Sequence, residues 1–536
     1  MQGLDPPGRR RRTPNAGGPT GSAPDPSPPS DGGTAVHDEA GPSDGSRLVA
    51  SLRAWAQRQQ GRYHYRLTCS AAPDQFPAAG RLRSLLEASL PPLPPAWVAA
   101  LELGWPPPLP GLHRIELVPG VAWISVAIGL KPAVLRRLCQ EASGQPAGST
   151  RFPPDAGAVV VGAGLAGCAM ADALMRRGWR VTVIDAASRV GGAIASVPLL
   201  AQHPALSPGD DRRSRLLLSA LLNSRRLADR FGASMTWCGR FQPMPLAEAR
   251  RRTAAIPAAI AQPIAVSEPD VHGVAGCEGI WYPLCAMAEP QHWWERLRGL
   301  ALLDLRLSQP VASLSRRPGR WQAHDGAGTV IASAPVMILA NQAQALTLAS
   351  MPDVASGQLR VSPVQAAIGT ASPDELMSSA RRRPTILGGS SYRLEKPGRY
   401  CVVGPFRVGM DSLGDHRITL PGLTVNDPAY RWSLCEPAER LLLRDNLPMI
   451  GAAPDTSAIL ASRDRFERND RLPLPRQEAL HLLTGLGGRG LLWSVLGAEM
   501  IAAALHGEPA VVEPDLQDAV DPARFLKRWL RRRGAG

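Results

Sequence analysis

The sequence has almost no lysine. Of its 60 basic residues only Lys131, Lys396 and Lys527 are lysines, so arginine carries nearly all the positive charge, and arginine suits bidentate contacts to phosphate or carboxylate. With 46 acidic residues the formal net charge is +14, which favours a polyanionic partner such as nucleic acid. A GC-rich genome, which favours arginine codons, would give the same composition, so the charge alone does not identify a substrate.

The sequence also lacks the patterns of a metal site, a disulfide framework and an exported protein. Its eight cysteines are scattered, with no C-x-x-C pair and no histidine cluster at ligand spacing, so neither zinc nor disulfides are indicated. The arginine run 9–12 is followed by Pro, Gly and Ser instead of the apolar segment of a signal peptide. No stretch of about 20 residues is apolar without interruption. We therefore expect a cytoplasmic protein with no metal and no membrane partner.

Glycine and proline, in contrast, are abundant, with 52 and 53 residues, and they divide the chain. Residues 1–45 carry almost no large apolar side chains, so ordering them would cost entropy with little burial in return, and we expect a disordered tail. Residues 46–143 alternate helical and strand-like patterns, and 144–156 form a linker. Residues 157–536 have the pattern of one large α/β domain.

A dinucleotide-binding motif opens this large domain. Gly162-Ala-Gly164-Leu-Ala-Gly167 lies between an apolar strand-like run and a helical pattern, and a second strand-like run ends in Asp185. The first glycine of such a motif makes the tight turn, the second lets backbone approach a pyrophosphate, and the third lets the helix pack against the strand. The phosphates lie at the helix N-terminus and the acid accepts from a ribose hydroxyl. Asp185 argues against a 2′-phosphate, which leaves FAD or NAD.

Two further segments favour FAD. Arg189-Val-Gly191-Gly192 resembles the R-x-G-G extension of flavoproteins of the glutathione-reductase type, and the runs near Val311 and Val336–Asn341 follow the order of amino-acid-oxidase-like flavoproteins. The run 485–491 is a second glycine-rich turn before a helical pattern, where a helix N-terminus would stabilise negative charge on a reduced flavin. The predicted FAD-binding residues are Gly162, Ala163, Gly164, Leu165, Ala166, Gly167, Asp185, Ala186, Arg189, Gly191, Gly192, Val311, Ala340, Asn341, Gly485, Gly487, Gly488, Arg489, Gly490 and Leu491.

Several segments together resemble one family. They are the run 159–185, Gly279–Pro283, Leu441–Gly451, the run 482–505 and Asp521–Leu526. With them the chain resembles D-amino-acid-oxidase-like flavoproteins and, more closely, the FAD-dependent oxidoreductase half of the bifunctional tRNA 5-methylaminomethyl-2-thiouridine biosynthesis proteins (MnmC). The resemblance implies an α/β fold: a glutathione-reductase-type FAD-binding Rossmann domain at 157–536 with an interleaved mixed α+β substrate domain, its substrate-side insertions roughly at 235–300 and 355–435.

The region 46–143 resembles the other half of the same proteins. Trp105–Leu117 and Val121–Gly129 are similar to the middle of the methyltransferase half. That half usually carries a Gly-rich S-adenosylmethionine loop upstream and an Asp-Gly-Phe segment downstream, and this sequence shows neither. We therefore expect a truncated methyltransferase-like fragment without methyl transfer.

The resemblance implies a reaction on tRNA. It is the FAD-dependent oxidation of 5-carboxymethylaminomethyl(-2-thio)uridine at the wobble position to the 5-aminomethyl form with loss of glyoxylate, followed by a separate methyltransferase. The substrate carboxylate needs a cation, for which Arg489, Arg393 and Arg407 are candidates. Trp281 and Tyr282 would stack an unstacked base or form an ordinary core strand. No catalytic acid or base is identified.

Two alternatives stay open. One is a small-molecule amine or amino-acid oxidase of the same fold. The other is a catalytically degenerate flavin- or RNA-binding protein, favoured by Gly191–Pro198, which departs from the Gly-Ala-Ser-Gly-Asn segment that the family usually shows.

Overall fold

The computed structural model describes most of the chain. The described residues are 34–40, 46–58, 62–69, 84, 94–104, 109–143, 152, 156–204, 206, 212–227, 235–254, 256–258, 260–265, 276–351, 359–364, 366–371, 385–388, 392–396, 399–403, 407–410, 416–420, 423–425, 430–435, 438–469 and 471–534.

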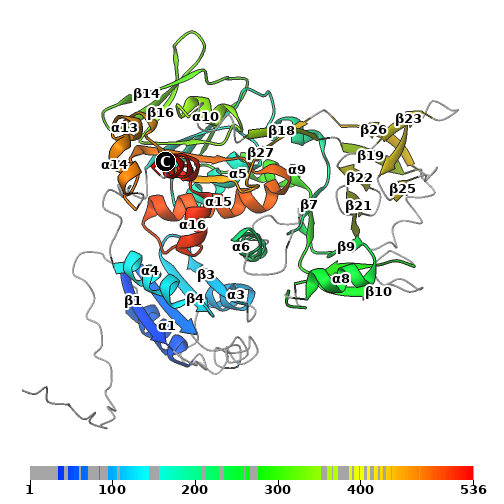
Figure 1. The fold of residues 1–536 in the computed structure, drawn as a ribbon, viewed down its shortest axis with the longest axis horizontal. Helices are drawn as coiled ribbons and strands as arrows, with labels where there is room; N and C mark the ends of the chain where they lie inside the picture. Colours follow the sequence, from blue (N-terminus) through cyan, green and yellow to red (C-terminus); the bar gives the residue numbers. More distant parts are fainter. Residues whose placement is uncertain are drawn as a thin grey trace, which may run out of the picture.

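A six-stranded sheet forms the centre of the molecule (Figure 1). Its order is β13 (Leu303–Arg306), β6 (Arg180–Ile184), β5 (Gly157–Val161), β17 (Val336–Leu339), β29 (Arg476–Thr484) and β28 (Met449–Pro454). The first five strands are parallel and β28 is antiparallel. Strands β5 and β17 are continuous apolar runs because a parallel sheet is covered on both faces. The predicted α/β fold with a Rossmann-type core is confirmed.

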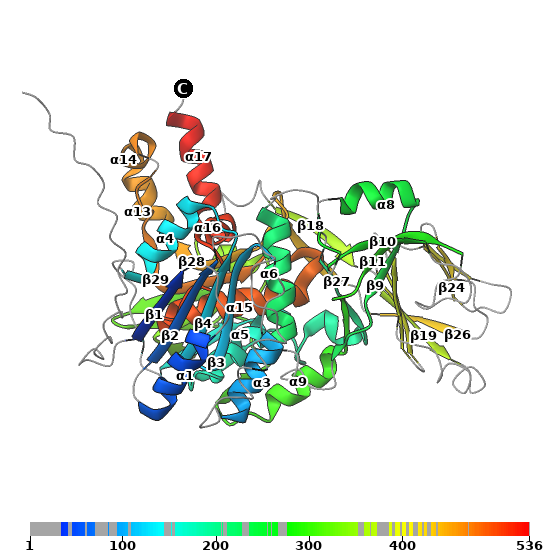
Figure 2. The same ribbon diagram turned by 90° about the horizontal axis from the view of Figure 1, so that it is seen from below.

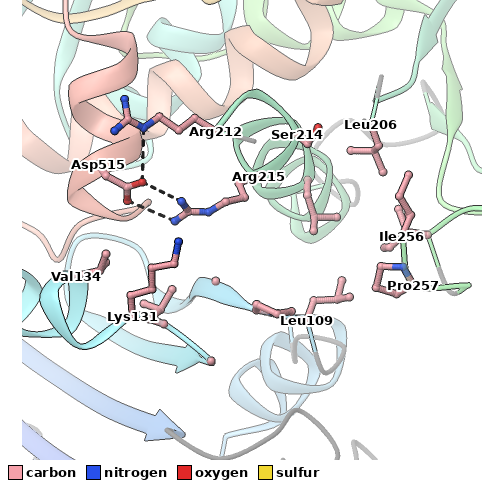
Figure 3. A pocket seen from close by; sticks show the side chains of 16 residues that line it. Leu109, Lys131, Val134, Leu206, Arg212, Ser214, Arg215, Ile256, Pro257 and Asp515 are labelled. Carbon is pink, nitrogen blue, oxygen red and sulfur yellow. Dashed lines mark hydrogen bonds and ion pairs between the residues drawn. The ribbon is translucent and has the colours of Figure 1, made fainter. Parts of the chain in front are cut away.

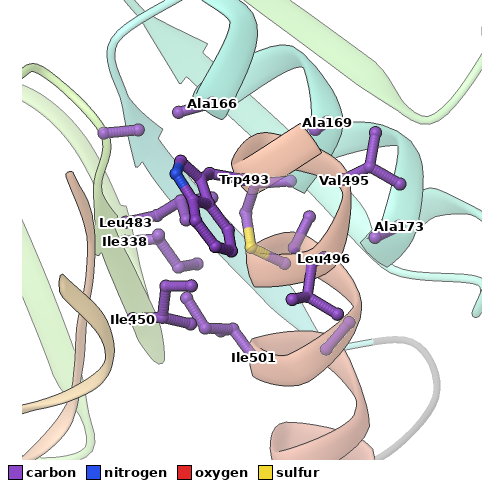
Figure 4. Packing of buried hydrophobic residues seen from close by; sticks show 14 of the residues in the cluster. Ala166, Ala169, Ala173, Ile338, Ile450, Leu483, Trp493, Val495, Leu496 and Ile501 are labelled. Carbon is purple, nitrogen blue, oxygen red and sulfur yellow. The ribbon is translucent and has the colours of Figure 1, made fainter. Parts of the chain in front are cut away.

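The two faces of this sheet are covered by different elements. Ala158 and Val160 of β5 belong to a core shared with α5 (Leu165–Met175), α6 (Arg212–Arg226) and α15 (Gly490–His506). Their neighbours Val159 and Val161 belong to a second core, shared with the antiparallel sheet of β14 (Ser313–Arg317), β15 (Arg320–His324) and β16 (Val330–Ala334). Figure 4 shows Trp493 of α15 packed in the first core.

From the sequence alone, Val330–Leu339 has the pattern of one strand, but the structure divides it between two sheets. Its first part is β16 and its second part is β17, with Pro335 between them. Proline has no backbone N–H and interrupts strand pairing, which explains the change of sheet at this residue.

A second large sheet lies to one side of the molecule. Its order is β10 (Gln262–Ala265), β11 (Glu278–Tyr282), β9 (Arg240–Pro243), β20 (Thr385–Gly388), β21 (Tyr392–Lys396), β22 (Arg399–Val403), β19 (Ala366–Ala371) and β26 (Tyr430–Leu434). Three smaller sheets contain β7 (Leu200–Gln202), β12 (Ala286–Ala288) and β8 (Met235–Thr236); β18 (Leu359–Val364) and β27 (Ala438–Leu443); and β23 (Arg407–Met410), β24 (His416–Leu420) and β25 (Leu423–Val425).

The remaining helices of these regions are short. They are η2 (Gly192–Ser196), α8 (Leu246–Thr253), α9 (Pro290–Arg298), α10 (Gln344–Leu348), α13 (Thr456–Ala461), α14 (Arg463–Arg468), η4 (Gly487–Arg489), α16 (Pro514–Val520) and α17 (Arg524–Gly534). Within the described ranges, one helical segment, Gly487–His506, is long and apolar enough to cross a membrane, and 72% of its window is buried inside the protein. Such burial is typical of a core helix.

The N-terminal region has a sheet of its own, shown in blue in Figures 1 and 2. Its order is β1 (Thr34–Ala40), β2 (Arg62–Cys69), β4 (Ala122–Ile128) and β3 (Gly111–Val118), with helices α1 (Ser46–Arg58), α3 (Pro95–Gly104) and α4 (Pro132–Ser143). The sequence predicts a disordered tail at residues 1–45, but residues 34–40 of this segment form β1, which pairs in parallel with β2 along its whole length. Backbone hydrogen bonds to an existing strand stabilise a segment that has little apolar surface. Residues 1–33 and 41–45 of that tail lie outside the described residues.

A buried ion-pair cluster joins this sheet to the large domain. Glu508 accepts hydrogen bonds from Arg114 Nη2 at 2.5 Å and from Arg177 Nε at 2.6 Å. Arg177 Nη2 also lies 3.1 Å from Glu499 and 3.4 Å from Glu116. Arg114 and Glu116 lie on β3, whereas Arg177 and Glu508 follow the ends of α5 and α15 and Glu499 lies within α15. The cluster therefore crosses the contact between the two regions.

Candidate functional site

The turn from β5 to α5 has the geometry of a phosphate-binding loop. Gly162 has φ +108, and a Cβ there would lie 2.7 Å from the carbonyl oxygen of Ala340. A Cβ on Gly167 would lie 1.7 Å from the carbonyl oxygen of Gly162, whereas nothing lies within 4 Å of the Cβ position of Gly164. The first and third glycines are therefore required by close packing, and the second faces open space at the N-terminus of α5, where an anion binds favourably. The residues between them, Ala163, Leu165 and Ala166, are buried.

Asp185 follows the end of β6 and lies beside this turn. Its Oδ2 accepts from the backbone N–H of Ala163 at 2.5 Å, and its Oδ1 accepts from Ala187 N–H at 2.7 Å. These bonds fix the carboxylate, and a carboxylate has about four acceptor positions, so it retains acceptors for a ribose hydroxyl. The next residue, Ala186, is exposed.

The R-x-G-G segment is anchored on the same turn. Gly191 N–H donates to the carbonyl oxygen of Ala163 at 2.9 Å. Gly191 has φ +89, and a Cβ there would lie 2.3 Å from the ring of Trp294. Gly192 faces open space and Arg189 is exposed. The segment thus extends the first turn and leaves room beside it.

The carboxyl end of β17 contributes a buried acceptor. Ala340 N–H donates to the carbonyl oxygen of Val161 at 2.8 Å, which holds this end against β5. Asn341 Nδ2 donates to Gln344 Oε1 at 3.2 Å, while Asn341 Oδ1 is buried without a hydrogen-bond partner among the described residues. Val311 is buried next to this group, and its carbonyl oxygen accepts from Gln344 Nε2 at 3.0 Å. A buried acceptor of this kind fits a donor supplied by a ligand.

The second glycine turn, after β29, lies at the same end of the sheet. Gly485 has φ +71, and Thr484 Oγ1 donates to the carbonyl oxygen of Gln342 at 2.7 Å. A Cβ on Gly490 would lie 3.0 Å from Leu165 Cδ1. The N-termini of α15 and α5 therefore lie side by side, and both helix dipoles direct positive charge to this edge. Together, the open glycines, the fixed acid and the buried acceptor fit FAD.

The charges of three arginines, two of them at this second turn, act on one buried histidine. His203 is 5% exposed. Burial lowers the pKa of His203 well below its ordinary value, and the positive charges of Arg240, Arg489 and Arg440 lower it further. His203 is therefore neutral at neutral pH, and the three guanidinium groups supply the positive charge of this cluster.

Each arginine reaches the cluster from a different element. Arg240, on β9, is buried, lies 5.2 Å over the ring of Tyr282 and donates to the carbonyl oxygen of Gly388 at 2.8 Å. Arg440, on β27, lies beside the second turn, because a Cβ on Gly488 would be 3.5 Å from its Nη1. Arg489 belongs to the turn itself. We call Arg240, Arg440 and Arg489 the arginine cluster; guanidinium groups of this kind recognise carboxylates.

The three arginines that the sequence predicts as ligands of the substrate carboxylate have different surroundings in the structure. Arg489 belongs to the arginine cluster. Arg393 is paired with Glu395 on β21, at 2.8 Å. The side chain of Arg407 lies outside the part of the chain that is described. Sequence reasoning missed Arg240 and Arg440, which lie in no recognisable motif.

Trp281 and Tyr282, the two aromatic residues considered for base stacking, are half-buried and buried, respectively. Tyr282 is 5% exposed and lies under Arg240. Trp281 packs against Gly239, where a Cβ would lie 2.2 Å from its ring. These contacts favour the core-strand alternative for Tyr282.

Comparison with known proteins gives consistent results. Residues 158–504 match the family model described as FAD dependent oxidoreductase. The chain is 33% identical over 416 residues to the tRNA 5-methylaminomethyl-2-thiouridine biosynthesis bifunctional protein MnmC of Ralstonia nicotianae, covering 70% of this chain and 61% of that protein. It is 32% identical over 422 residues to the MnmC of Burkholderia lata, covering 71% and 61%. The chain thus spans about 61% of the length of these relatives.

Two solved structures share the fold. One is the fructosyl amine:oxygen oxidoreductase (Amadoriase I) of Aspergillus fumigatus, with a TM-score of 0.51, 18% identity, and coverage of 72% of this chain and 92% of the other. The second is glycine oxidase from Geobacillus kaustophilus, with a TM-score of 0.50, 16% identity, and coverage of 69% and 99%.

Proposed function

Because this chain belongs to the FAD dependent oxidoreductase family and its cofactor is FAD, we propose that it oxidises 5-carboxymethylaminomethyl(-2-thio)uridine at the wobble position of tRNA to the 5-aminomethyl form, releasing glyoxylate. The proposal rests on the likeness to the tRNA-modification proteins of Ralstonia and Burkholderia and on the arginine cluster. A separate methyltransferase would act on the product.

The arginine cluster is the observation that carries this proposal. The substrate side chain is an N-substituted glycine, so a carboxylate is joined by one methylene to the amine that is oxidised. Arg440 and Arg489 lie at the second glycine turn, next to the N-terminus of α15. A carboxylate bound there holds the neighbouring methylene close to the same edge of the sheet.

The protein's own part in the reaction is orientation. FAD, when bound, supplies the hydride acceptor for the C–N oxidation. Arg440 and Arg489 bind the carboxylate, and Arg240 is fixed by Gly388 and Tyr282. A hydride leaves the methylene carbon and a proton leaves the nitrogen, together two electrons and two protons, which gives the imine. Water then adds to the imine carbon, and the C–N bond breaks to give the amine and glyoxylate. His203 is neutral and so adds no further charge to this region.

The tRNA partner is supported by charge. The formal net charge is +14, and Arg250, Arg251 and Arg252 of α8 are exposed. Exposed arginines provide phosphate contacts that position an RNA without reading its sequence.

The direct test is nucleoside mass analysis after incubating the FAD-loaded protein with tRNA that carries the 5-carboxymethylaminomethyl group. We expect the aminomethyl nucleoside and an equal amount of glyoxylate. Neither product would appear if the proposal is wrong.

Variants of the arginine cluster test its role. We expect Arg440→Met and Arg489→Met each to lower kcat/KM by about 10- to 100-fold, because a hydrogen bond to a charged group contributes about 1.5–3 kcal/mol. Arg393→Met is the matched control, since Arg393 is paired with Glu395, and it should retain activity. Equal losses in all three variants would refute the assignment.

The same cluster also fits a second function, the oxidation of a small amino acid. It would bind the carboxylate of free glycine or sarcosine as well as that of a modified nucleoside. Turnover of sarcosine without salt-dependent tRNA binding would favour this function, because tRNA binding through phosphates weakens steeply with salt.

A further inference from the structure

The C-terminal helix α17 carries charge of one sign only. Residues 522–536 contain six basic residues and no acidic residue. In Figure 2 the helix projects away from the central sheet, beside α13 and α14. Arg528 and Arg531 are exposed on it, and Lys527 is half-buried. The other basic residues are Arg524, Arg532 and Arg533, of which the last two have side chains outside the described part of the chain.

The apolar face of α17 is already inside the protein. Leu526 and Leu530 are buried in a core that they share with Ile459 of α13 and Phe466 of α14, and Phe525 is buried in the second core of the central sheet. A helix that binds a lipid surface inserts its apolar face into the lipid. Because this face is occupied, the solvent side of α17 offers charge without apolar surface, which suits a polyanion in water and not a membrane.

The first turns of α17 are fixed to the edge of the sheet that holds the cofactor. Arg524 donates from Nε and Nη2 to the carboxylate of Asp445, at 3.0 and 3.1 Å, and Arg528 Nη1 donates to the same carboxylate at 3.1 Å. Asp445 lies between β27 and β28. Leu443, the last residue of β27, lies against the second glycine turn, since a Cβ on Gly485 would be 2.8 Å from Leu443 Cδ1. The helix therefore has a fixed position relative to the oxidation site.

The neighbouring segments do not cancel the charge of α17. Residues 455–472, which include α13 and α14, contain four basic and four acidic residues, and Asp445 is preceded by Arg444. Residues 521–536 contain six basic residues and one acidic residue, so a surplus of five positive charges belongs to this segment. The count includes every Lys, Arg, Asp and Glu of these segments and does not depend on which side chains are paired.

The acidic residues of α16, the helix before α17, are matched by other elements. Asp518 pairs with Arg137 of α4 at 2.7 Å. Asp515 pairs with Arg215 of α6 at 2.8 Å (Figure 3). Each of these two carboxylates faces an arginine of another helix, so neither offsets the surplus on α17.

We propose that α17 binds the phosphate backbone of the tRNA outside the wobble nucleoside, an inference that rests on the proposed function, which names tRNA as the substrate. The oxidation site holds one nucleoside, so most of the tRNA backbone lies beyond it. Lys527, Arg528 and Arg531 contact the phosphates, and such contacts position an RNA without reading its sequence. Because α17 is fixed relative to the oxidation site, these contacts hold the RNA while the nucleoside is oxidised.

The salt dependence of binding to unmodified tRNA tests the proposal, because this measurement needs no reaction. Fluorescence anisotropy of labelled tRNA gives the Kd of the FAD-loaded protein over a series of salt concentrations. Each contact between a basic side chain and a phosphate contributes about 0.7–0.9 to the slope of log Kd against log salt concentration. We expect Lys527→Gln/Arg531→Gln to lower this slope by about 1.4–1.8, and Arg531→Gln alone, at an exposed position, to lower it by about half as much.

A matched control removes the same charge elsewhere. Arg47 lies on α1 of the N-terminal region, and Arg180 begins β6, which is four strands away from β28 in the central sheet; both side chains are exposed. Arg47→Gln/Arg180→Gln should keep the slope of the unmodified protein. Thermal unfolding shows that each variant is folded.

Three results would overturn the proposal. One is an unchanged slope in Lys527→Gln/Arg531→Gln, the second is an equal loss of slope in the control variant, and the third is a loss of binding to anionic phospholipid vesicles while tRNA binding is kept. Glyoxylate release from modified tRNA is measured separately. Its absence would refute the proposed function, whereas tRNA binding by α17 is decided by the slopes.

Discussion

The buried ion-pair cluster makes a strong prediction for Glu508→Gln. The Glu508 side chain is fully buried, and so is that of Arg177, while Arg114 is 4% exposed. The substitution keeps the shape but leaves two buried guanidinium groups short of one negative charge. Removing one partner of a buried pair costs about 3–5 kcal/mol, because the remaining charge is left uncompensated. We expect a loss of that size in the free energy of unfolding.

A matched control lies at the same contact between the two regions. Arg137 of α4 pairs with Asp518 of α16 at 2.7 Å, and these side chains are 46% and 60% exposed. Asp518→Asn makes the same chemical change, but an exposed pair contributes only about 0–1 kcal/mol. Urea unfolding of the holoenzyme, monitored by tryptophan fluorescence, gives the free energy of unfolding of both variants from the midpoint and slope of each curve. Equal midpoints for the two variants would refute the reasoning.

The pH dependence of the unfolding free energy tests the same prediction independently. Burial tends to raise the pKa of Glu508, but the charges of Arg114 and Arg177 hold it well below the ordinary value of 4.5. A carboxyl with a depressed pKa contributes stability that is present above its unfolded pKa and is lost as pH falls below it. The stability difference between the Glu508→Gln variant and the unmodified protein should therefore narrow as pH falls from about 5.5 toward 3.5. A constant difference would show that Glu508 does not act through its charge.

Two more predictions follow from the glycine turns and the buried histidines. Gly164→Ala should leave the apoprotein as stable as the unmodified chain, because its Cβ meets only open space, but it should abolish FAD binding, because that space is where the phosphates are expected at the N-terminus of α5. Gly167→Ala should destabilise the apoprotein itself, because its Cβ would lie 1.7 Å from the Gly162 oxygen. Flavin absorbance after dialysis and thermal unfolding distinguish the two effects, and loss of stability in both variants would contradict the assignment. Burial lowers the pKa of His113 to about 3, and its Nε2 lies 2.8 Å from the carbonyl oxygen of Leu109. His113 stays neutral in the folded protein, whereas in the unfolded chain its imidazole takes up a proton below about pH 6.5. The free energy of unfolding should therefore decrease as the pH drops from about 6.5 to about 4, and His113→Gln should make this decrease less steep. An unchanged dependence of the unfolding free energy on pH would refute the prediction.

The first glycine turn could be predicted from sequence because every requirement is local. A buried parallel strand gives an apolar run, and the helix begins where the glycines end. The helical pattern after the glycines extends from about Leu165 to Arg177 in the sequence, and the helix in the structure, Leu165–Met175, is close to it. Each glycine has its geometric reason within a few residues or on one adjacent strand.

Other elements depend on distant partners. From the sequence alone, Tyr400–Val408 has the pattern of one strand, but the structure divides it between β22, in the eight-stranded sheet, and β23, in a different sheet. Local alternation of side chains does not reveal which sheet a strand joins. The arginine cluster is a second case, because Arg240 and Arg440 come from strands far apart in the chain. Only Arg489 could be found, because it lies within a motif.

The N-terminal sheet has a structural role in the flavin-binding domain. Helices α5 and α15 have their N-termini at the cofactor edge, and their other ends meet this fragment. Arg62 of β2 donates to the carbonyl oxygen of His506, the last residue of α15, at 2.9 Å, which satisfies a terminal carbonyl that has no partner within its helix. Arg114 of β3 neutralises Glu508 beyond the same helix end. Without the N-terminal sheet these polar groups would lose their partners, so the sheet contributes to the stability of the flavin-binding domain.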